Sequence, residues 1–179
     1  RPSSHSCPRR SRFQRVTLAQ ASCLADAIEA GYGILAQGGP ALIAVECTIC
    51  LLEQSGLFNA GRGAKRQLDG VQRMDAAIME GIHLEAGAVA SLEGILHPIT
   101  AARLVMEETD HVLLVGPLAS RFARHNKLDR HRSTGVSRRL SYDGILVRQK
   151  RAPTERHGTV GAVALDRSGT VAAGASTGG

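Results

Sequence analysis

HGTVGAVALD, residues 157–166, is the stretch from which the fold of this chain can be worked out. A Gly-Thr pair precedes an apolar run with β-branched residues, which predicts a buried strand. If the Gly158–Thr159 bond is cut, Thr159 gains a free α-amine beside its own hydroxyl. One residue then supplies both nucleophile and base, as in enzymes with an N-terminal threonine. Taken alone, a Gly-Thr pair before a strand is more typical of an ordinary turn.

The elements around this stretch come in paired blocks. Thr159–Leu165 and Thr170–Ala175 predict a hairpin around a four-residue turn. Helical spacing of apolar residues predicts helices over Thr17–Gln37 and Pro40–Glu53, followed by a glycine-punctuated loop at Leu57–Gly63. The remaining segments predict strands at 71–79, 84–92 and 111–116, and helices from Pro98 and over 117–125. Paired blocks of strands and helices favour a layered α+β fold over a Rossmann alternation.

Composition allows one globular domain and little more. The chain has 179 residues, of which 43% are hydrophobic and 3% aromatic, so an aliphatic core is expected. No apolar run approaches the length of a membrane span, and no secretory signal is visible. Because the chain begins with Arg and not Met, we expect a fragment or a processed product.

The net charge of +6 is unevenly distributed, because basic residues crowd residues 121–156. A nucleic-acid footprint is one interpretation, but few aromatic residues accompany the cluster and no helix-turn-helix or RNP-like pattern is present. We favour an exposed, mobile connector. Four segments are therefore expected: a disordered or divergent lead at 1–16, a core at 17–128, the basic connector at 129–158, and a further unit at 159–179.

Cysteines and histidines do not form a recognisable site in the sequence. Cys47 and Cys50 form a CxxC pair on one helix face, but no second pair completes a zinc site, so small buried hydrophobic side chains are expected. A reducing, cytoplasmic setting fits this cysteine usage. His83, His97 and His111 lie at the ends of expected elements, where surface or capping roles are the simplest. Two acidic residues, Asp75 and Asp166, are expected to be structural.

Six segments carry a resemblance to a known family. In chain order they are LLEQSGLFNAGRGA (51–64), MDAAIMEG (74–81), GAVA (87–90), HVLLVG (111–116), HGTVGAVALD (157–166) and STGG (176–179). Together they resemble the plant-type asparaginase / isoaspartyl peptidase group of N-terminal nucleophile hydrolases. This resemblance implies a four-layer αββα sandwich, here as the α subunit plus the first hairpin of the β subunit.

The resemblance also implies a chemistry. The precursor would cut itself between Gly158 and Thr159, and Thr159 would become the nucleophile. Thr177 matches a second threonine that hydrogen-bonds near the nucleophile, and Asn59 matches a residue close to it. The substrate would be L-asparagine or a β-aspartyl dipeptide, and no cofactor would be required.

Further expectations concern ions and partners. Family members hold a structural sodium ion with backbone carbonyls, and carbonyl oxygens suit such a hard cation. The matching positions are Leu52, Glu53, Ser55, Phe58, Ala60 and Arg62. The resemblance implies a dimer of αβ pairs in the complete protein, with neither nucleic acid nor a membrane as partner.

The chain also departs from the family pattern. Residues 1–16 lack the His-Gly-Gly-Ala-Gly segment with which the family opens, and Pro117-Leu118-Ala119 replaces a more usual glycine-rich turn. The chain stops at Gly179, before the positions of the oxyanion-hole Thr-Gly pair and of the Arg and Asp that bind substrate. We therefore expect this polypeptide to be inactive alone unless another chain supplies the remainder. A non-catalytic remnant of the family is the alternative, and a basic nucleic-acid binder is a weaker one.

Overall fold

The computed structural model describes residues 16–67, 69–131 and 158–178 and shows a mixed α+β fold. Residues 1–15 and 132–157 lie outside the described residues, and with them lies most of the expected lead and basic connector. The helices and strands follow one another as α1 (Leu18–Ala36), α2 (Ala41–Ser55), the short 3-10 helix η1 (Gly61–Gly63), β1 (Met74–Glu80), β2 (Ala86–Leu92), α3 (Pro98–Glu108), β3 (Leu113–Val115), α4 (Gly116–His125), β4 (Val160–Leu165) and β5 (Val171–Gly178).

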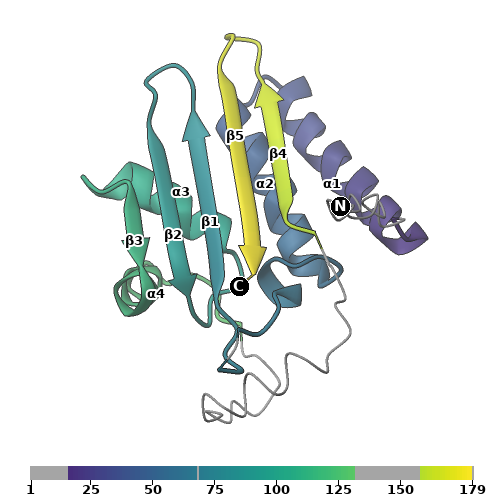
Figure 1. The fold of residues 1–179 in the computed structure, drawn as a ribbon. Helices are drawn as coiled ribbons and strands as arrows, with labels where there is room; N and C mark the ends of the chain where they lie inside the picture. Colours follow the sequence, from purple (N-terminus) through teal and green to yellow (C-terminus); the bar gives the residue numbers. More distant parts are fainter. Residues whose placement is uncertain (1–15, 68, 132–157, 179) are drawn as a thin grey trace, which may run out of the picture.

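The five strands form one sheet in the order β3-β2-β1-β5-β4. β1 pairs antiparallel with both β2 and β5, β4 and β5 form the predicted hairpin, and β2 pairs parallel with β3. The C-terminal hairpin is therefore inserted next to a strand from the middle of the chain (Figure 1). This pairing places Thr177 opposite Asp75 and Val160 opposite Ser176.

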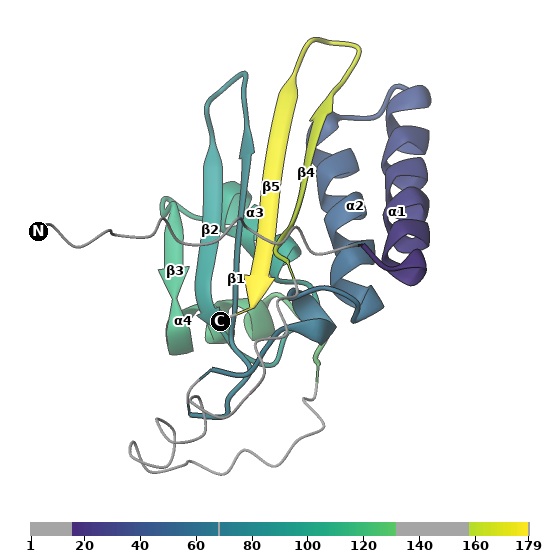
Figure 2. The ribbon, with the colours of Figure 1, turned by 45° about the vertical axis from the view of Figure 1, so that its right-hand side comes forward.

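The helices cover one face of the sheet (Figures 1 and 2). Side chains alternate accordingly along β1, where Met74, Ala76 and Ile78 are buried while Ala77 and Met79 are exposed. Leu92 of β2 and the α3 residue Ile99 contribute to the same aliphatic core. The opposite face carries no helix or second sheet among the described residues, which thus form two layers.

Close packing between the layers depends on glycines in the strands. A Cβ added to Gly87 of β2 would overlap the backbone oxygen of Ala102 and lie 2.6 Å from the backbone nitrogen of Met106, both in α3. A Cβ on Gly174 of β5 would lie 2.9 Å from Cδ1 of Ile49 in α2. These two positions let the helices approach the sheet more closely than any side chain would permit.

Helix ends agree with the local sequence signals. Thr17 and Gln20 form a capping box at the start of α1, where Thr17 Oγ1 accepts a 3.2 Å hydrogen bond from the Gln20 backbone N–H. α2 follows Pro40 and ends at Gly56, whose φ of 72° lies in the left-handed region that favours glycine. Among the described helices, none combines the length and the apolar character that a membrane span requires.

Three strands differ most from the prediction, and one of them, β5, continues to Gly178 instead of ending at Ala175. β1 begins at Met74 rather than at Val71, because the preceding residues form a turn in which the Gln67 N–H donates to the Val71 oxygen over 2.8 Å. The apolar run HVLLVG predicts a buried strand over 111–116, but β3 covers only Leu113–Val115. Because side chains alternate along a strand, Leu114 points to the helix-covered face and is buried, while Leu113 and Val115 point to the uncovered face and are exposed.

Candidate active site

Thr159 and Thr177 meet where β4 begins and β5 ends. The Thr159 hydroxyl donates a hydrogen bond to the Thr177 hydroxyl, with 3.0 Å between the two Oγ1 atoms. The antiparallel hairpin brings these residues together across 18 positions of sequence. Thr159 is exposed, so a reactant can reach its hydroxyl from solvent. Both threonines that the family resemblance singled out therefore lie at one point of the fold.

Asn59 joins the loop after α2 to both ends of this hairpin. Its backbone N–H donates to the Gly158 oxygen over 3.1 Å, and its backbone oxygen accepts from the Gly178 N–H over 2.8 Å. Its side-chain amide donates to the Gly178 oxygen over 3.1 Å and accepts from the Lys65 N–H over 2.8 Å. Asn59 thus contacts the carbonyl of the Gly158–Thr159 bond and the backbone that follows Thr177.

The loop that carries Asn59 is tightly curled. A Cβ added to Gly61 would lie 2.6 Å from the Glu53 backbone oxygen, and one added to Gly63 would overlap the Phe58 oxygen and lie 2.7 Å from that of Gly56. Only glycine fits these positions, because any side chain would collide with the backbone. Backbone carbonyls of the end of α2 and of the loop therefore converge on η1.

The six positions expected to bind sodium all lie in this curled segment. Three of their carbonyl oxygens already accept hydrogen bonds: Leu52 from the Ser55 hydroxyl at 2.7 Å, Ala60 from the Gly63 N–H at 3.1 Å, and Arg62 from the Gln72 amide at 3.2 Å. A carbonyl oxygen has two lone pairs, so these bonds leave capacity for a cation. The donor set is all oxygen, which fits a hard ion such as Na⁺.

Asp166 and Asp75 have structural contacts, as the sequence suggested. Asp166 accepts hydrogen bonds from the Ser168 hydroxyl at 2.6 Å and from the Ala41 N–H at 2.9 Å, so it closes the hairpin turn and holds the start of α2. These bonds, first of all that from Ser168, lower the pKa of Asp166 to about 2. Asp75 accepts the Ser91 N–H over 2.8 Å and thereby ties β1 to β2.

Sequence spacing missed a group of three side chains beneath the sheet. His97 lies with Nδ1 3.3 Å from Oε2 of Glu53, which is fully buried at 0% exposure. Cys50, one turn earlier in α2, completes a cluster in which one nitrogen, oxygen or sulfur atom of each residue lies within 4.8 Å of the others. His97 does occupy the N-cap position of α3, as expected, but its side chain makes no capping bond and contacts Glu53 instead. The signal available in the sequence was the Cys50–Glu53 pair, three residues apart on one helix face.

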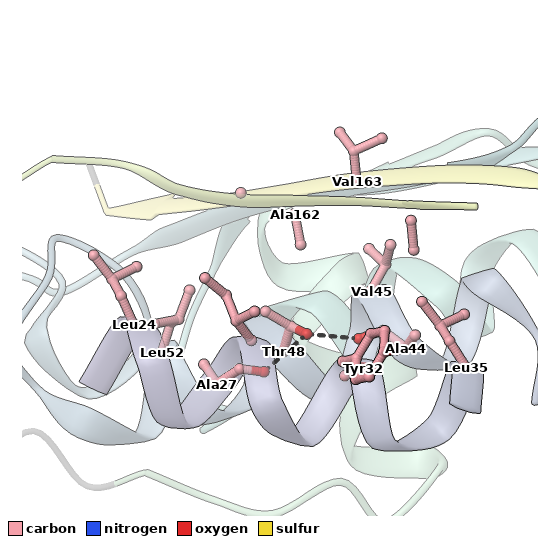
Figure 3. Close-up of a pocket in the computed structure, with 14 residues that line it drawn as sticks. Leu24, Ala27, Tyr32, Leu35, Ala44, Val45, Thr48, Leu52, Ala162 and Val163 are labelled. Carbon is pink, nitrogen blue, oxygen red and sulfur yellow. Dashed lines mark hydrogen bonds between the residues drawn. The ribbon is translucent and has the colours of Figure 1, made fainter. Parts of the chain in front are cut away.

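An apolar cavity of about 310 Å³ lies between α1, α2 and β4. Thr48 is one of its few polar lining residues, and its hydroxyl oxygen lies 2.8 Å from the Ala44 oxygen and 3.2 Å from the Ala27 oxygen (Figure 3). The lining includes neither Asn59 nor the two threonines of the candidate site. We therefore assign no chemistry to this cavity.

Comparison with known proteins shows to which family the chain belongs. A family model described as "Asparaginase" matches residues 5–179. The isoaspartyl peptidase of Salmonella typhimurium is 41% identical over 168 residues, which cover 87% of this chain and 54% of that relative. The plant-type L-asparaginase of Pyrococcus abyssi is 44% identical over 171 residues, covering 86% of this chain and 55% of the relative.

A vertebrate relative, the isoaspartyl peptidase/L-asparaginase of Xenopus laevis, is 40% identical over 158 residues, covering 86% of this chain and 51% of the relative. The chain thus spans about half the length of the curated relatives it matches. The family match covers nearly all of the sequence and includes every residue of the candidate site. This chain belongs to the asparaginase family, whose members include isoaspartyl peptidases and plant-type L-asparaginases.

Proposed function

We propose that this chain is part of a threonine-dependent amidohydrolase that acts on L-asparagine or on β-aspartyl dipeptides. The observation that carries the proposal is the 3.0 Å hydrogen bond between Thr159 and Thr177 at the Gly158–Thr159 bond. Support comes from relatives with 40–44% identity that are named isoaspartyl peptidase or plant-type L-asparaginase. The activity is a property of the whole protein, to which these residues contribute the nucleophile.

The first step is cleavage of the chain at its own Gly158–Thr159 bond. The Thr159 oxygen attacks the Gly158 carbonyl carbon, the C–N bond breaks, and the threonine nitrogen takes up the hydroxyl proton. Water then hydrolyses the resulting ester, which leaves a carboxylate on Gly158 and a free α-amine on Thr159. The Asn59 N–H, 3.1 Å from the Gly158 oxygen, stabilises the negative charge that develops there.

The freed amine then serves as the base. An α-amine has an ordinary pKa of about 7.7–8.0, so a substantial fraction is unprotonated near neutral pH. It accepts the Thr159 hydroxyl proton while the oxygen attacks the side-chain amide carbon of the substrate. The proton passes to the leaving nitrogen, ammonia or an amino acid departs, and water hydrolyses the acyl ester. Before attack, the Thr177 oxygen accepts the Thr159 hydrogen bond and so fixes the position of the attacking oxygen. When the Thr159 hydroxyl proton moves to the amine, the Thr177 hydroxyl can keep that position by donating to the Thr159 oxygen.

The bare face of the sheet supports an αββα sandwich as the fold of the whole protein. In an αββα sandwich, a second sheet packs on this face and a second helical layer covers it in turn. The exposed side chains there are apolar, among them Met79, Val163 and Val171, as such packing requires. We extend the proposal to a dimer of αβ pairs in the cytoplasm, with the curled loop after α2 holding a structural sodium ion.

Intact-mass measurement tests the cleavage step. Purified wild-type protein should yield a new fragment that begins at Thr159, and Thr159→Ala should abolish it. The matched control is Thr170→Ala, which alters a threonine in the turn of the same hairpin and should leave cleavage intact. An uncut bond in a folded, catalytically active protein of the relatives' length would contradict the mechanism.

Hydrolysis is tested on a protein that contains this chain at the length of its relatives. Release of ammonia from L-asparagine, or of amino acids from a β-aspartyl dipeptide, should occur in the wild type and disappear in Thr159→Ala. Hydrolysis that survives this substitution would show that another residue is the nucleophile. Cleavage without hydrolysis of either substrate would instead favour a remnant that has lost activity.

A further inference from the structure

Cys50, Glu53 and His97 form a compact cluster where α2 meets the start of α3. Cys50 and Glu53 project from one face of α2, and His97 is the residue that precedes the first turn of α3. One nitrogen, oxygen or sulfur atom of each residue lies within 4.8 Å of those of the other two. Glu53 and His97 are 44 positions apart in the sequence, so the cluster links α2 to the start of α3.

The surrounding contacts orient two of these side chains. Glu53 Oε1 accepts a 3.1 Å hydrogen bond from the Ile99 N–H, which leaves Oε2 directed at His97 Nδ1. Cys50 Sγ lies 3.5 Å from the Thr100 hydroxyl. In metal sites, hydrogen bonds from residues that do not themselves bind the metal fix the orientation of the ligands.

Burial makes a bare carboxylate costly at this position. Glu53 is fully buried, and removing an unpaired carboxylate from water is strongly unfavourable. One carboxyl oxygen of Glu53 accepts a hydrogen bond from the Ile99 N–H. This N–H lies in the first turn of α3 and has no partner within the helix, and His97, the residue before the helix, makes no capping side-chain bond. The other carboxyl oxygen lies at hydrogen-bond distance from His97 Nδ1, and the Cys50 sulfur completes a cluster whose ligand atoms lie within 4.8 Å of one another.

We propose that Cys50, Glu53 and His97 bind one divalent transition-metal ion of the zinc type. Bond lengths of about 2.0–2.2 Å from Zn²⁺ to nitrogen and oxygen ligands place two tetrahedral ligands about 3.3–3.5 Å apart. The distance of 3.3 Å between His97 Nδ1 and Glu53 Oε2 fits that edge. A mixed sulfur, nitrogen and oxygen donor set suits zinc or cobalt and not magnesium or calcium.

Binding requires the thiol to ionise. The Cys50 proton leaves to the buffer as the sulfur bonds to the metal, and the positive charge of the ion stabilises the thiolate and the carboxylate together. A water molecule completes the tetrahedron from the side of His97, whose side chain is 20% exposed. This site uses the carboxyl group of Glu53, whereas the sodium proposal uses its backbone carbonyl, so the two are independent.

Titration of the reduced wild-type protein with Zn²⁺ tests the proposal, using a chromogenic chelator as competitor. One equivalent should bind, and Cys50→Ser or His97→Gln should weaken binding at least tenfold. Cys47→Ser, one turn earlier on the same helix, and His83→Gln, an exposed histidine, are the matched controls that should bind as the wild type does. Equal binding by all five proteins would place the metal elsewhere and overturn the proposal.

Co²⁺ gives a second readout that does not depend on any variant. A cobalt ion bound to the Cys50 thiolate should produce a sulfur-to-cobalt charge-transfer band in the near ultraviolet. Circular dichroism of each metal-free variant shows whether it folds, and the Co²⁺ spectrum of the wild type decides the matter if both variants fail to fold. If the folded wild-type protein binds no Zn²⁺ and shows no such band, the proposal is overturned. The cluster is then only a buried contact between Glu53 and His97.

Discussion

Asn59 is a single residue on which the geometry of the cleavage bond depends. Its side chain holds the Gly178 oxygen and the Lys65 N–H, while its backbone N–H reaches the Gly158 oxygen. Asn59→Ala keeps the backbone hydrogen bonds to Gly158 and Gly178 but removes the side-chain bonds to the Gly178 oxygen and the Lys65 N–H. Because small displacements of reacting groups are costly, cleavage at Gly158–Thr159 should slow by about ten- to a hundredfold.

The measurement for Asn59→Ala is a time course of intact mass. Asn126→Ala, at the end of α4, is the matched control, since it removes the same amide far along the chain from the hairpin. Cleavage of both variants at the wild-type rate would mean that the Asn59 amide has no part in positioning the bond.

Asp166 makes the stability of the hairpin depend on pH. Its pKa is about 2 in the folded chain and about 3.9 for an ordinary aspartate. A lowered pKa means that the ionised form stabilises the fold above pH 4, and that this contribution is lost as the pH falls from about 4 to 2. Asp166→Asn should therefore lower the melting temperature at pH 7 and have little effect at pH 2.

Thermal unfolding followed by circular dichroism at a series of pH values checks this expectation. Asp110→Asn, an exposed position, serves as the control for removing one negative charge. If the melting temperatures of Asp166→Asn and the wild type differ by the same amount from pH 7 to pH 2, the hydrogen bonds of the ionised carboxylate are not the cause of the difference.

At the scale of elements, the approach of α3 to β2 depends on Gly87. A methyl group there would overlap the Ala102 oxygen and lie 2.8 Å from the Met106 Cβ. Helix and strand must then separate, and overpacking of this kind destabilises a protein by about 1–3 kcal/mol. We expect Gly87→Ala to lower the free energy of unfolding by an amount in this range.

Gly33→Ala is the informative counterpart to Gly87→Ala. Gly33 lies within α1, and an added Cβ would meet nothing within 4 Å. Alanine favours a helix over glycine, so this change should raise the free energy of unfolding by about 0.5–1 kcal/mol. Urea unfolding measures the free energy of unfolding of both variants. If both are destabilised by the same amount, the close contact between α3 and β2 is not the cause.

Local signals in the sequence were sufficient to predict most helices and strands. They were insufficient to predict which elements lie side by side in the fold. α1 and α2 begin and end where Thr17, Pro40 and Gly56 indicate, since these residues act within one turn of the helix ends. No local signal specifies that β5 pairs with β1, or that β2 and β3 run parallel. The approach of His97 to Cys50 follows from that packing, so spacing along the chain could not predict it.

The site was predicted through resemblance more than through local physics. A Gly-Thr pair before a strand and an asparagine in a glycine-rich loop both have ordinary structural explanations. The structure brings Asn59, Thr159 and Thr177 together because the hairpin joins β1 and the loop crosses the end of β5. Such long-range contacts are formed by the packing of the sheet, which no single segment encodes.

At the scale of the molecule, one side of the sheet is packed by helices and the other presents apolar side chains to solvent. Figure 3 shows Ala162 of β4 directed toward the helices and Val163 directed away from them. The exposed apolar side chains of the bare face come from four strands: Ala77, Met79, Leu113, Val115, Val163, Leu165, Val171, Ala173 and Ala175. A contiguous apolar surface of this kind requires a partner.

By itself, the 179-residue chain should therefore associate through this face at moderate concentration and bind a dye that fluoresces on apolar surfaces. Val163→Lys should reduce both effects, because burying an ammonium group in an interface is costly. Leu18→Lys adds the same charge to an exposed apolar residue of α1 and should change neither. Sedimentation velocity measures the association. A wild-type chain that stays monomeric and does not increase the fluorescence of the dye would show that this face needs no second layer.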